Sequence, residues 1–317
     1  MNQYQQLWEF KSSVRSRPRK PIDFQQTGYF FPPDKQVLLL LPEIAVLGEQ
    51  VKKNILLLTL RKYLNDIVKL EIHSIHRACV NIINNQIIPY SQEMRLNAYT
   101  IILDEYYHAY NAADILSQLD EMYSTLPQFE YICSDSEHAL TTIKNKLPDK
   151  HREIFEIIAV SIFETTLIRE VVTTFQNESL HPSIRSYARD HMNDESRHYH
   201  FFYEILNYTW QHMSNESIEA IGPYIGEFLK LYLNIDQEKL FNFQIINWVL
   251  GNKIKCQQLI NELYQGFAIS EQIPIVNNVI NVLKRTELFK HKAVQEGFKL
   301  AQLNFDLLTS PTKLLAE

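Results

Sequence analysis

One short motif, present twice, contains the residues of this chain best suited to bind metal. The pattern Asp-Glu-x-x-His occurs at residues 104–108 and again at residues 194–198. Both copies lie in stretches with helical periodicity, where a glutamate and a histidine three residues apart share one helical face. Each pair can therefore bind one ion, and two such helices predict a metal site between them.

Two further glutamates complete a known ligand pattern. Dimetal carboxylate bundles take a Glu-x-x-His pair from each of two helices and a single glutamate from each of two others. Glu71 lies 34 residues before Glu105, and Glu164 lies 31 residues before Glu195, each within an apolar helical stretch. The sequence therefore predicts two similar halves, each with a lone-glutamate helix followed by an Asp-Glu-x-x-His helix.

The charge of these residues favours a pair of iron ions. A carboxylate inside an apolar stretch is costly unless it is paired, protonated or bound to metal. Four glutamates carry four negative charges, which two ferrous ions would balance. Carboxylate oxygens and imidazole nitrogens suit iron or manganese, whereas four carboxylates without a thiolate make a poor structural zinc site. We expect two iron ions in preference to a manganese–iron pair.

A third histidine lies on the same face as the second motif. His191 is four residues before Glu195 and seven before His198, and residues at these spacings share one helical face. We therefore expect His191 to bind the ion held by Glu195 and His198. The expected metal ligands are Glu71, Glu105, His108, Glu164, His191, Glu195 and His198.

Three neighbouring residues are expected to hold the ligands in place. Asp104 and Asp194 each precede a motif glutamate, and a carboxylate near a metal site often accepts a hydrogen bond from the outer N–H of a ligand histidine. Arg197 lies inside the second motif and is expected to orient a carboxylate. These residues would support the site without binding metal.

With all seven ligand positions filled, the pattern resembles the para-aminobenzoate N-oxygenase family, the diiron arylamine oxygenases. The resemblance covers residues 71–198, about two fifths of the chain. That family has a ferritin-like pair of Glu-x-x-His motifs and a third histidine ligand on the last helix. It implies a diiron enzyme that uses dioxygen, as co-substrate, to oxidise an amine nitrogen by N-hydroxylation toward a nitroso or nitro product.

Other functions remain open for such a site. One is a different diiron oxidase, such as a hydroxylase or a desaturase. Another is iron binding or storage, which we rank last because storage gains nothing from a third histidine. The expected partners are a small-molecule amine and an external electron donor, since the seven glycines form no phosphate-binding loop for a flavin or nicotinamide cofactor. A homodimer is compatible with the sequence.

Helical periodicity runs from about residue 50 through most of the chain, and no stretch alternates as a strand does. The first helical region has a break at Asn65-Asp66, and the connection 124–150 holds one short helix. Longer helices are predicted from Ser91 to about residue 118, over 151–178 and over 182–213. Later helices have breaks near Gly222-Pro223, Gly251 and Pro274. The expected fold is an all-α, ferritin-like helical bundle with additional C-terminal helices and a ligand core at 67–213.

Residues 1–47 are expected to form an irregular N-terminal arm, followed by a single helical domain at 48–317. The net charge of −6 argues against a nucleic-acid binder. The most apolar short run, Val37–Leu41, is far below the roughly 20 residues of a membrane span, and the N-terminus does not read as a signal peptide. We therefore expect a cytoplasmic protein. A solvated basic tail is the interpretation of Lys11, Arg15, Arg17, Arg19 and Lys20.

Overall fold

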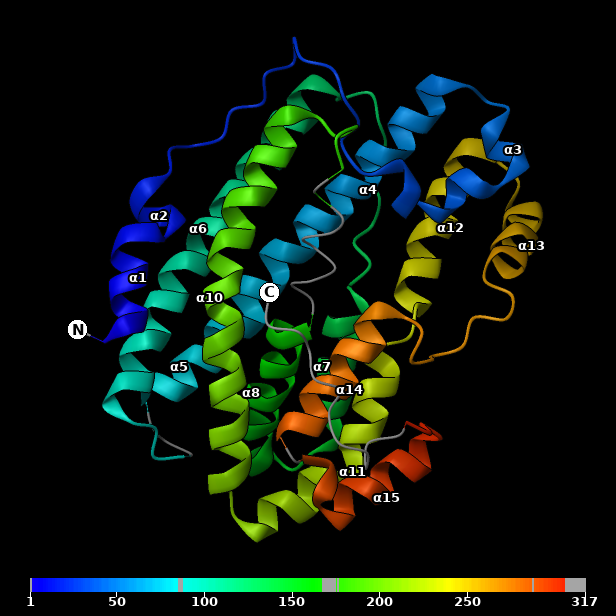
Figure 1. The fold of residues 1–317 in the computed structure, drawn as a ribbon. Coiled ribbons are helices and arrows are strands. Elements are labelled where there is room, and N and C mark those ends of the chain that lie inside the picture. Colours follow the sequence, from blue (N-terminus) through cyan, green and yellow to red (C-terminus); the bar gives the residue numbers. More distant parts are fainter. Residues whose placement is uncertain (1, 85–87, 167–174, 176, 287, 306–317) are drawn as a thin grey trace.

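The computed structural model describes residues 2–84, 88–166, 175, 177–286 and 288–305, which form an all-α bundle (Figure 1). The main helices are α1 (Gln3–Lys11), α2 (Ser13–Ser16), α3 (Pro42–Ala45), α4 (Glu49–Leu70), α5 (His76–Asn84), α6 (Gln92–Met122), α7 (Asp135–Lys146), α8 (Asp149–Thr166), α10 (Pro182–His212), α11 (Asn215–Tyr232), α12 (Asp236–Leu250), α13 (Lys253–Leu263), α14 (Pro274–Thr286) and α15 (Lys292–Ala301). Shorter elements are η1 (Pro33–Lys35), η2 (Val37–Leu40), the π-helical turn η3 (Glu71–Ile75) and η4 (Leu288–Lys290). The predicted all-α bundle with additional C-terminal helices is confirmed.

Four helical rods form the part of the bundle that carries the expected ligands. The first rod is made of α4, η3 and α5 in succession, and it packs beside α6, while α8 packs beside α10 and α5. Fully buried side chains fill the space between the rods, among them Ile82, Ile101, Phe155 and Phe163. Burial of each such side chain contributes about 1.5–3 kcal/mol. This packing holds the four rods in fixed positions around the polar residues between them.

The first rod changes from α-helix to π-helix at Glu71. Single π-helical turns inside α-helices are frequent at functional sites. The expected break at Asn65-Asp66 is wrong, because α4 continues through it. Asn65 Nδ2 donates to the Arg61 carbonyl at 2.9 Å, and Asp66 forms an ion pair with Lys62 one turn earlier, so both polar residues support the helix.

The helices that carry the two motifs begin where the sequence indicates. The Ser91 side chain accepts a hydrogen bond from the Met94 amide and caps α6, and Pro182 is the first residue of α10. The predicted helix 151–178 corresponds to α8 as far as residue 166. Residues 167–174 and 176 lie outside the described residues. Residues 177–181 are not helical, and α10 follows them.

The expected break at Gly222-Pro223 is also wrong, because α11 runs through it. A Cβ at Gly226 would lie 2.3 Å from the Gly297 carbonyl oxygen, and one at Gly297 would lie 2.4 Å from the Pro223 oxygen. The backbones of α11 and α15 therefore touch, as only glycine permits. This close packing compensates for the hydrogen bond that Pro223 removes. The expected break at Gly251 is present, with that residue left-handed at the end of α12.

The N-terminal arm is more ordered than expected. Helices α1 and α2 lie along α6 and α10 on one side of the bundle (Figure 1). Arg17 and Lys20 pair with Asp190 at 3.4 and 2.5 Å, and Arg19 pairs with Asp114 at 2.7 Å. The arm is helical in α1 and α2 and irregular from Arg17 to Asp23. Arg17, Arg19 and Lys20 attach it to the bundle, so the expectation of a solvated basic tail is wrong for these three residues.

Candidate metal centre

All seven expected ligands lie together in the interior of the four rods. Glu71 comes from η3, Glu164 from α8, and the two motifs come from α6 and α10. None of the seven residues is more than 9% exposed. The structure therefore brings into one buried region residues that are up to 127 positions apart in the chain.

The seven residues form two groups whose ligand atoms lie within 4.8 Å of one another. Glu195 belongs to both groups, so the two sites are adjacent. The members of the first group are Glu71, His108, His191 and Glu195, and those of the second are Glu105, Glu164, Glu195 and His198.

His191 therefore lies with His108 and not, as expected, with His198. Residues seven apart are separated by about 10 Å along a helix axis, so His191 and His198 would bind different ions although they share a helical face. Glu195 lies between them in the sequence and reaches both.

Glu105 spans the two groups with its two oxygens. Its Oε2 is 3.2 Å from His108 Nδ1, and its Oε1 is 3.0 Å from His198 Nδ1. Glu195 Oε1 lies 3.5 and 3.4 Å from the same two nitrogens. Two ligand atoms bound at right angles to one ion at about 2.1 Å are about 3 Å apart. The observed spacing would therefore allow two adjacent ions, with Glu105 and Glu195 each within reach of the ion that His108 would hold and of the ion that His198 would hold.

His191 approaches the centre through its other ring nitrogen. His191 Nε2 is 3.1 Å from Glu195 Oε1 and 3.4 Å from Glu71 Oε1. Its Nδ1 faces the Tyr187 hydroxyl at 3.4 Å, and its ring stacks on His108 with 4.2 Å between centroids. If His191 Nδ1 carries the proton and donates a hydrogen bond to the Tyr187 oxygen, the Nε2 lone pair is free to bind metal. Tyr187 was not expected from the motif, although its position four residues before His191 places it on the same face.

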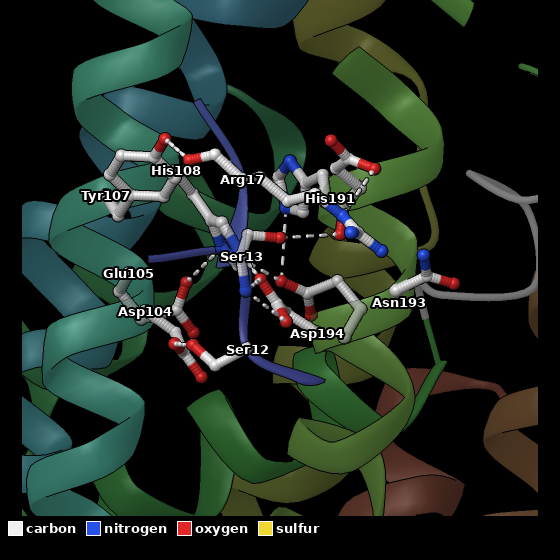
Figure 2. Close-up of polar contacts among 12 residues, drawn as sticks. Ser12, Ser13, Arg17, Asp104, Glu105, Tyr107, His108, His191, Asn193 and Asp194 are labelled. Atoms are coloured by element: carbon white, nitrogen blue, oxygen red, sulfur yellow. Dashed lines mark hydrogen bonds and ion pairs between the residues drawn. The ribbon is translucent and has the colours of Figure 1, made fainter. Parts of the chain in front are cut away.

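The two motifs support each other through crossed hydrogen bonds. Asp194 Oδ2 of the second motif lies 3.1 Å from His108 Nε2 of the first (Figure 2). Asp104 Oδ2 of the first motif lies 3.4 Å from His198 Nε2 of the second. Arg197 Nη2 donates to both carboxylates, at 2.9 Å to Asp104 and 2.6 Å to Asp194. Asp104, Asp194 and Arg197 therefore lie where they can hold the rings of the two motif histidines in place.

Several buried polar atoms of the centre have no hydrogen-bond partner among the described residues. They include Glu71 Oε2, Glu164 Oε2, Glu105 Oε1 and His198 Nδ1. The last two atoms are only 3.0 Å apart, yet they are not aligned as donor and acceptor. Two lone pairs that face a common point in this way are typical of ligands to one ion. The donor set therefore fits a pair of metal ions.

Burial also acts on the charges of these carboxyl groups. The pKa of Glu71 and that of Glu164 are raised well above the ordinary value, first by burial and then by neighbouring glutamates. For Glu195, burial alone would raise the pKa, but His198 and His191 outweigh it and the pKa is lowered. For Asp194, burial alone would also raise the pKa, but the hydrogen bond and charge of His108, with Ser13 and Arg197, together outweigh it and the pKa is lowered. Burial and the neighbouring carboxylates thus favour the protonated form of Glu71 and Glu164 when no cation is bound.

A cavity of about 210 Å³ opens beside the centre. Four of the expected ligands, Glu71, Glu164, His191 and Glu195, line its inner end. The rest of the wall surface is mostly apolar, and it is completed by Tyr63 and Asp66 of α4, by Ser134 before α7 and by Ser136 in the first turn of α7. The centre is therefore accessible to a small molecule from one side. Its apolar wall residues are Ile67, Leu70, Ile75 and Met192.

No protein-family model matches the chain, and no curated protein matches it significantly. None of the helices in the described ranges is long and apolar enough to cross a membrane. Function is therefore inferred from the chemistry of the centre and from the sequence pattern.

Proposed function

We propose that this protein is a non-haem diiron oxygenase that uses dioxygen to oxidise an amine nitrogen, by N-hydroxylation toward a nitroso or nitro product. The observation that carries the proposal is the pair of adjacent ligand groups bridged by Glu105 and Glu195 beside an accessible cavity. The resemblance of the ligand pattern to the arylamine oxygenases supports the choice of reaction.

Iron is the metal that this donor set favours. Four carboxylates balance the charge of two divalent ions, and oxygen and imidazole ligands without thiolate suit iron better than structural zinc. A manganese–iron pair would satisfy the same charge and is the second choice. In the described part of the chain, the ion pairs of Glu71, Glu105 and Glu195 are formed with histidines alone. A buried glutamate elsewhere, Glu156, is instead neutralised by Arg77 and Lys144 at 2.6 Å each.

When bound, two ferrous ions would supply electrons and open positions for dioxygen. The residues of the chain would orient the reactants. Asp104 and Asp194 fix the rings of His198 and His108 by accepting their outer N–H groups. The apolar cavity wall limits the access of water. A substrate in the cavity would lie next to the four expected ligands that line it. Further electrons would come from an external donor.

The size of the cavity limits the amine. An apolar cavity of about 150 Å³ is large enough for benzene. A cavity of about 210 Å³ therefore fits an amine with a single ring or a short alkyl chain. The mostly apolar wall favours an uncharged substrate body, with its nitrogen directed toward the ligands.

The test is single-turnover product analysis. The full chain is loaded with iron, reduced without oxygen and mixed with ¹⁸O₂ and a panel of small amines. Hydroxylamine, nitroso or nitro products that contain ¹⁸O support the proposal, whereas hydroxylated or desaturated carbon would indicate another diiron oxidase. Iron content separates catalysis from storage, since two ions per chain are expected and hundreds per assembly would indicate storage. Glu105→Ala, which removes a bridging ligand, is the negative control.

A further inference from the structure

The outer side of Asp104 and Asp194 is covered by the N-terminal arm. Trp8 Nε1 donates to Asp104 Oδ1 at 2.9 Å, and Ser12 Oγ donates to the same oxygen at 2.5 Å. The backbone N–H of Ser13 donates to both oxygens of Asp194 at 3.1 Å. Figure 2 shows Ser12 and Ser13 facing the two aspartates from the side away from the bundle. Trp8 is 7% exposed, so its hydrogen bond is shielded from water.

These contacts leave each aspartate surrounded by donors. Asp104 accepts from Trp8 and Ser12 with one oxygen and from Arg197 and His198 with the other. A carboxylate whose neighbours are all hydrogen-bond donors is held in one orientation and acts as an acceptor. It can then interact with a histidine only by accepting the Nε2–H. The proton is thus kept on Nε2, and the Nδ1 lone pair is directed at the metal.

The arrangement contains two separate chains of contacts. In one, Trp8 and Ser12 hold Asp104, which holds His198 of the second ligand group. In the other, the Ser13 amide holds Asp194, and Asp194 holds His108 of the first ligand group. Each series of contacts therefore leads to the ligands of a different ion. Arg197 connects the two series because it donates to both aspartates.

The arm is also attached on either side of these contacts. Arg17 and Lys20 pair with Asp190, the residue directly before His191. The Tyr107 hydroxyl, next to the first motif histidine, donates to the Arg17 carbonyl at 2.8 Å. The arm is therefore bound to the same stretches of α6 and α10 that carry the ligands.

We propose that the N-terminal arm is a working part of the metal centre. Trp8 and Ser12 position His198 through Asp104. The Ser13 amide positions His108 through Asp194. These are positioning residues, because none of them lines the two ligand groups. The inference rests on the metal centre of the proposed function but not on its reaction, so metal binding tests it without any amine substrate.

The first test titrates the metal-free full chain with Co²⁺. Dissociation constants are measured by competition with a chelator, and the geometry of the bound ions is read from visible absorption. The double variant Trp8→Phe/Ser12→Ala keeps an aromatic ring but removes both donors to Asp104. One of the two ions should bind about 10- to 100-fold more weakly, with an altered spectrum, and the other should be unchanged. Ser12→Thr alone keeps the hydroxyl that donates to Asp104, so this variant should bind both ions as the wild type does.

Ser16→Ala is the matched control for the first test. Ser16 lies on the same arm and donates its hydroxyl to the Ser12 carbonyl at 2.8 Å. Its hydrogen bond does not involve either aspartate, so this variant should bind both ions as the wild type does. Circular dichroism at the assay temperature should show the same helix content for all metal-free variants as for the metal-free wild type, which separates positioning from a failure to fold.

The second test addresses the other ion through Ser13→Pro. Ser13 is the first residue of α2, where proline is tolerated, and Ser12 already has the extended backbone that a residue before proline requires (φ −59°, ψ 136°). The substitution removes the N–H that Asp194 accepts. The ion of the first group should then bind more weakly. Ser13→Ala keeps this N–H and is the matched control.

Two results would overturn the inference alone. One is a wild type that binds two Co²⁺ ions while Trp8→Phe/Ser12→Ala and Ser13→Pro bind both with unchanged affinity and spectrum. The other is equal weakening by the Ser16→Ala and Ser13→Ala controls. A wild type that binds no Co²⁺ would overturn the metal centre itself. Retained binding without amine oxidation would overturn the proposed reaction and leave the role of the arm standing.

Discussion

Removal of metal should lower the melting temperature, and the loss should become smaller at low pH. Glu71 and Glu164 each have a buried oxygen that finds no hydrogen-bond partner in the described part of the chain. The pKa of both groups is raised, first by burial and then by neighbouring glutamates. Bound cations would remove both the unpaired oxygens and the repulsion between the carboxylates, so the folded chain should be more stable with metal.

The size of the effect follows from linkage. An ion present at 100 times its dissociation constant stabilises the folded state by about 2.7 kcal/mol, so two ions contribute about 5 kcal/mol. An unfolding entropy of about 2.1 cal/mol/K per residue gives about 0.7 kcal/mol/K for 317 residues. The melting temperature should therefore fall by about 8 K when both ions are removed at pH 7.

The direction of the pH dependence follows from the raised pKa values. A carboxyl group whose folded pKa lies above its unfolded value binds more protons when folded. Lowering the pH from the raised pKa toward the ordinary value of 4.5 therefore stabilises the metal-free folded chain. Protons also compete with metal for the same oxygens and weaken the loaded form. The gap between the two forms should narrow from pH 7 toward pH 5.

The assay is scanning calorimetry of chelator-stripped and iron-loaded protein at pH 7, 6 and 5. Glu156→Ala is a matched control, because Glu156 is a buried glutamate two turns before Glu164 on α8 that pairs with Arg77 and Lys144. It should lower both melting temperatures and leave the gap unchanged, whereas Glu105→Ala should reduce the gap. Equal melting of the two wild-type forms at pH 7, or a gap that widens as the pH falls, would refute the reasoning.

Three further predictions concern single residues. Glu105→Ala should lose at least one of two irons, because its oxygens face different histidines; elemental analysis that still gives two irons would show the ligand assignment to be wrong. His191→Ala should keep most of its iron, since four carboxylates still balance the charge, but it should lose amine oxidation; full oxidation would remove His191 from the centre. Ile67→Trp should fill part of the cavity, keep both irons and slow amine oxidation at least 10-fold; unchanged turnover would place the substrate elsewhere.

Local spacing was sufficient to predict the helices that carry the two motifs and the residues that face the centre. A glutamate and a histidine three residues apart share a helical face whatever the helix packs against. The same holds for His191 and Glu195. The costly burial of Glu71 and Glu164 in apolar stretches was also visible in the sequence. The all-α class and the seven residues that meet in the interior could therefore be predicted from the sequence.

Contacts between helices were decided only by the tertiary structure. Helical periodicity states the direction of a side chain around its own axis, but not the rotation and offset of the neighbouring helix. For this reason the crossed pairing of Asp194 with His108 and the placement of His191 with the first group could not be read from spacing. Tertiary packing also overrode the local helix-breaking signals at Asn65-Asp66 and Gly222-Pro223.

The contacts of the N-terminal arm had no local signal at all. Trp8 and Ser12 meet Asp104 across 96 and 92 residues, and Ser13 meets Asp194 across 181. A tryptophan and two serines in a basic segment are ordinary surface residues until a neighbouring helix presents buried carboxylates to them. The sequence by itself determined which side chains could bind metal, whereas the folded chain decided which residues hold those side chains in place, because such support depends on distances between segments that no sequence spacing encodes.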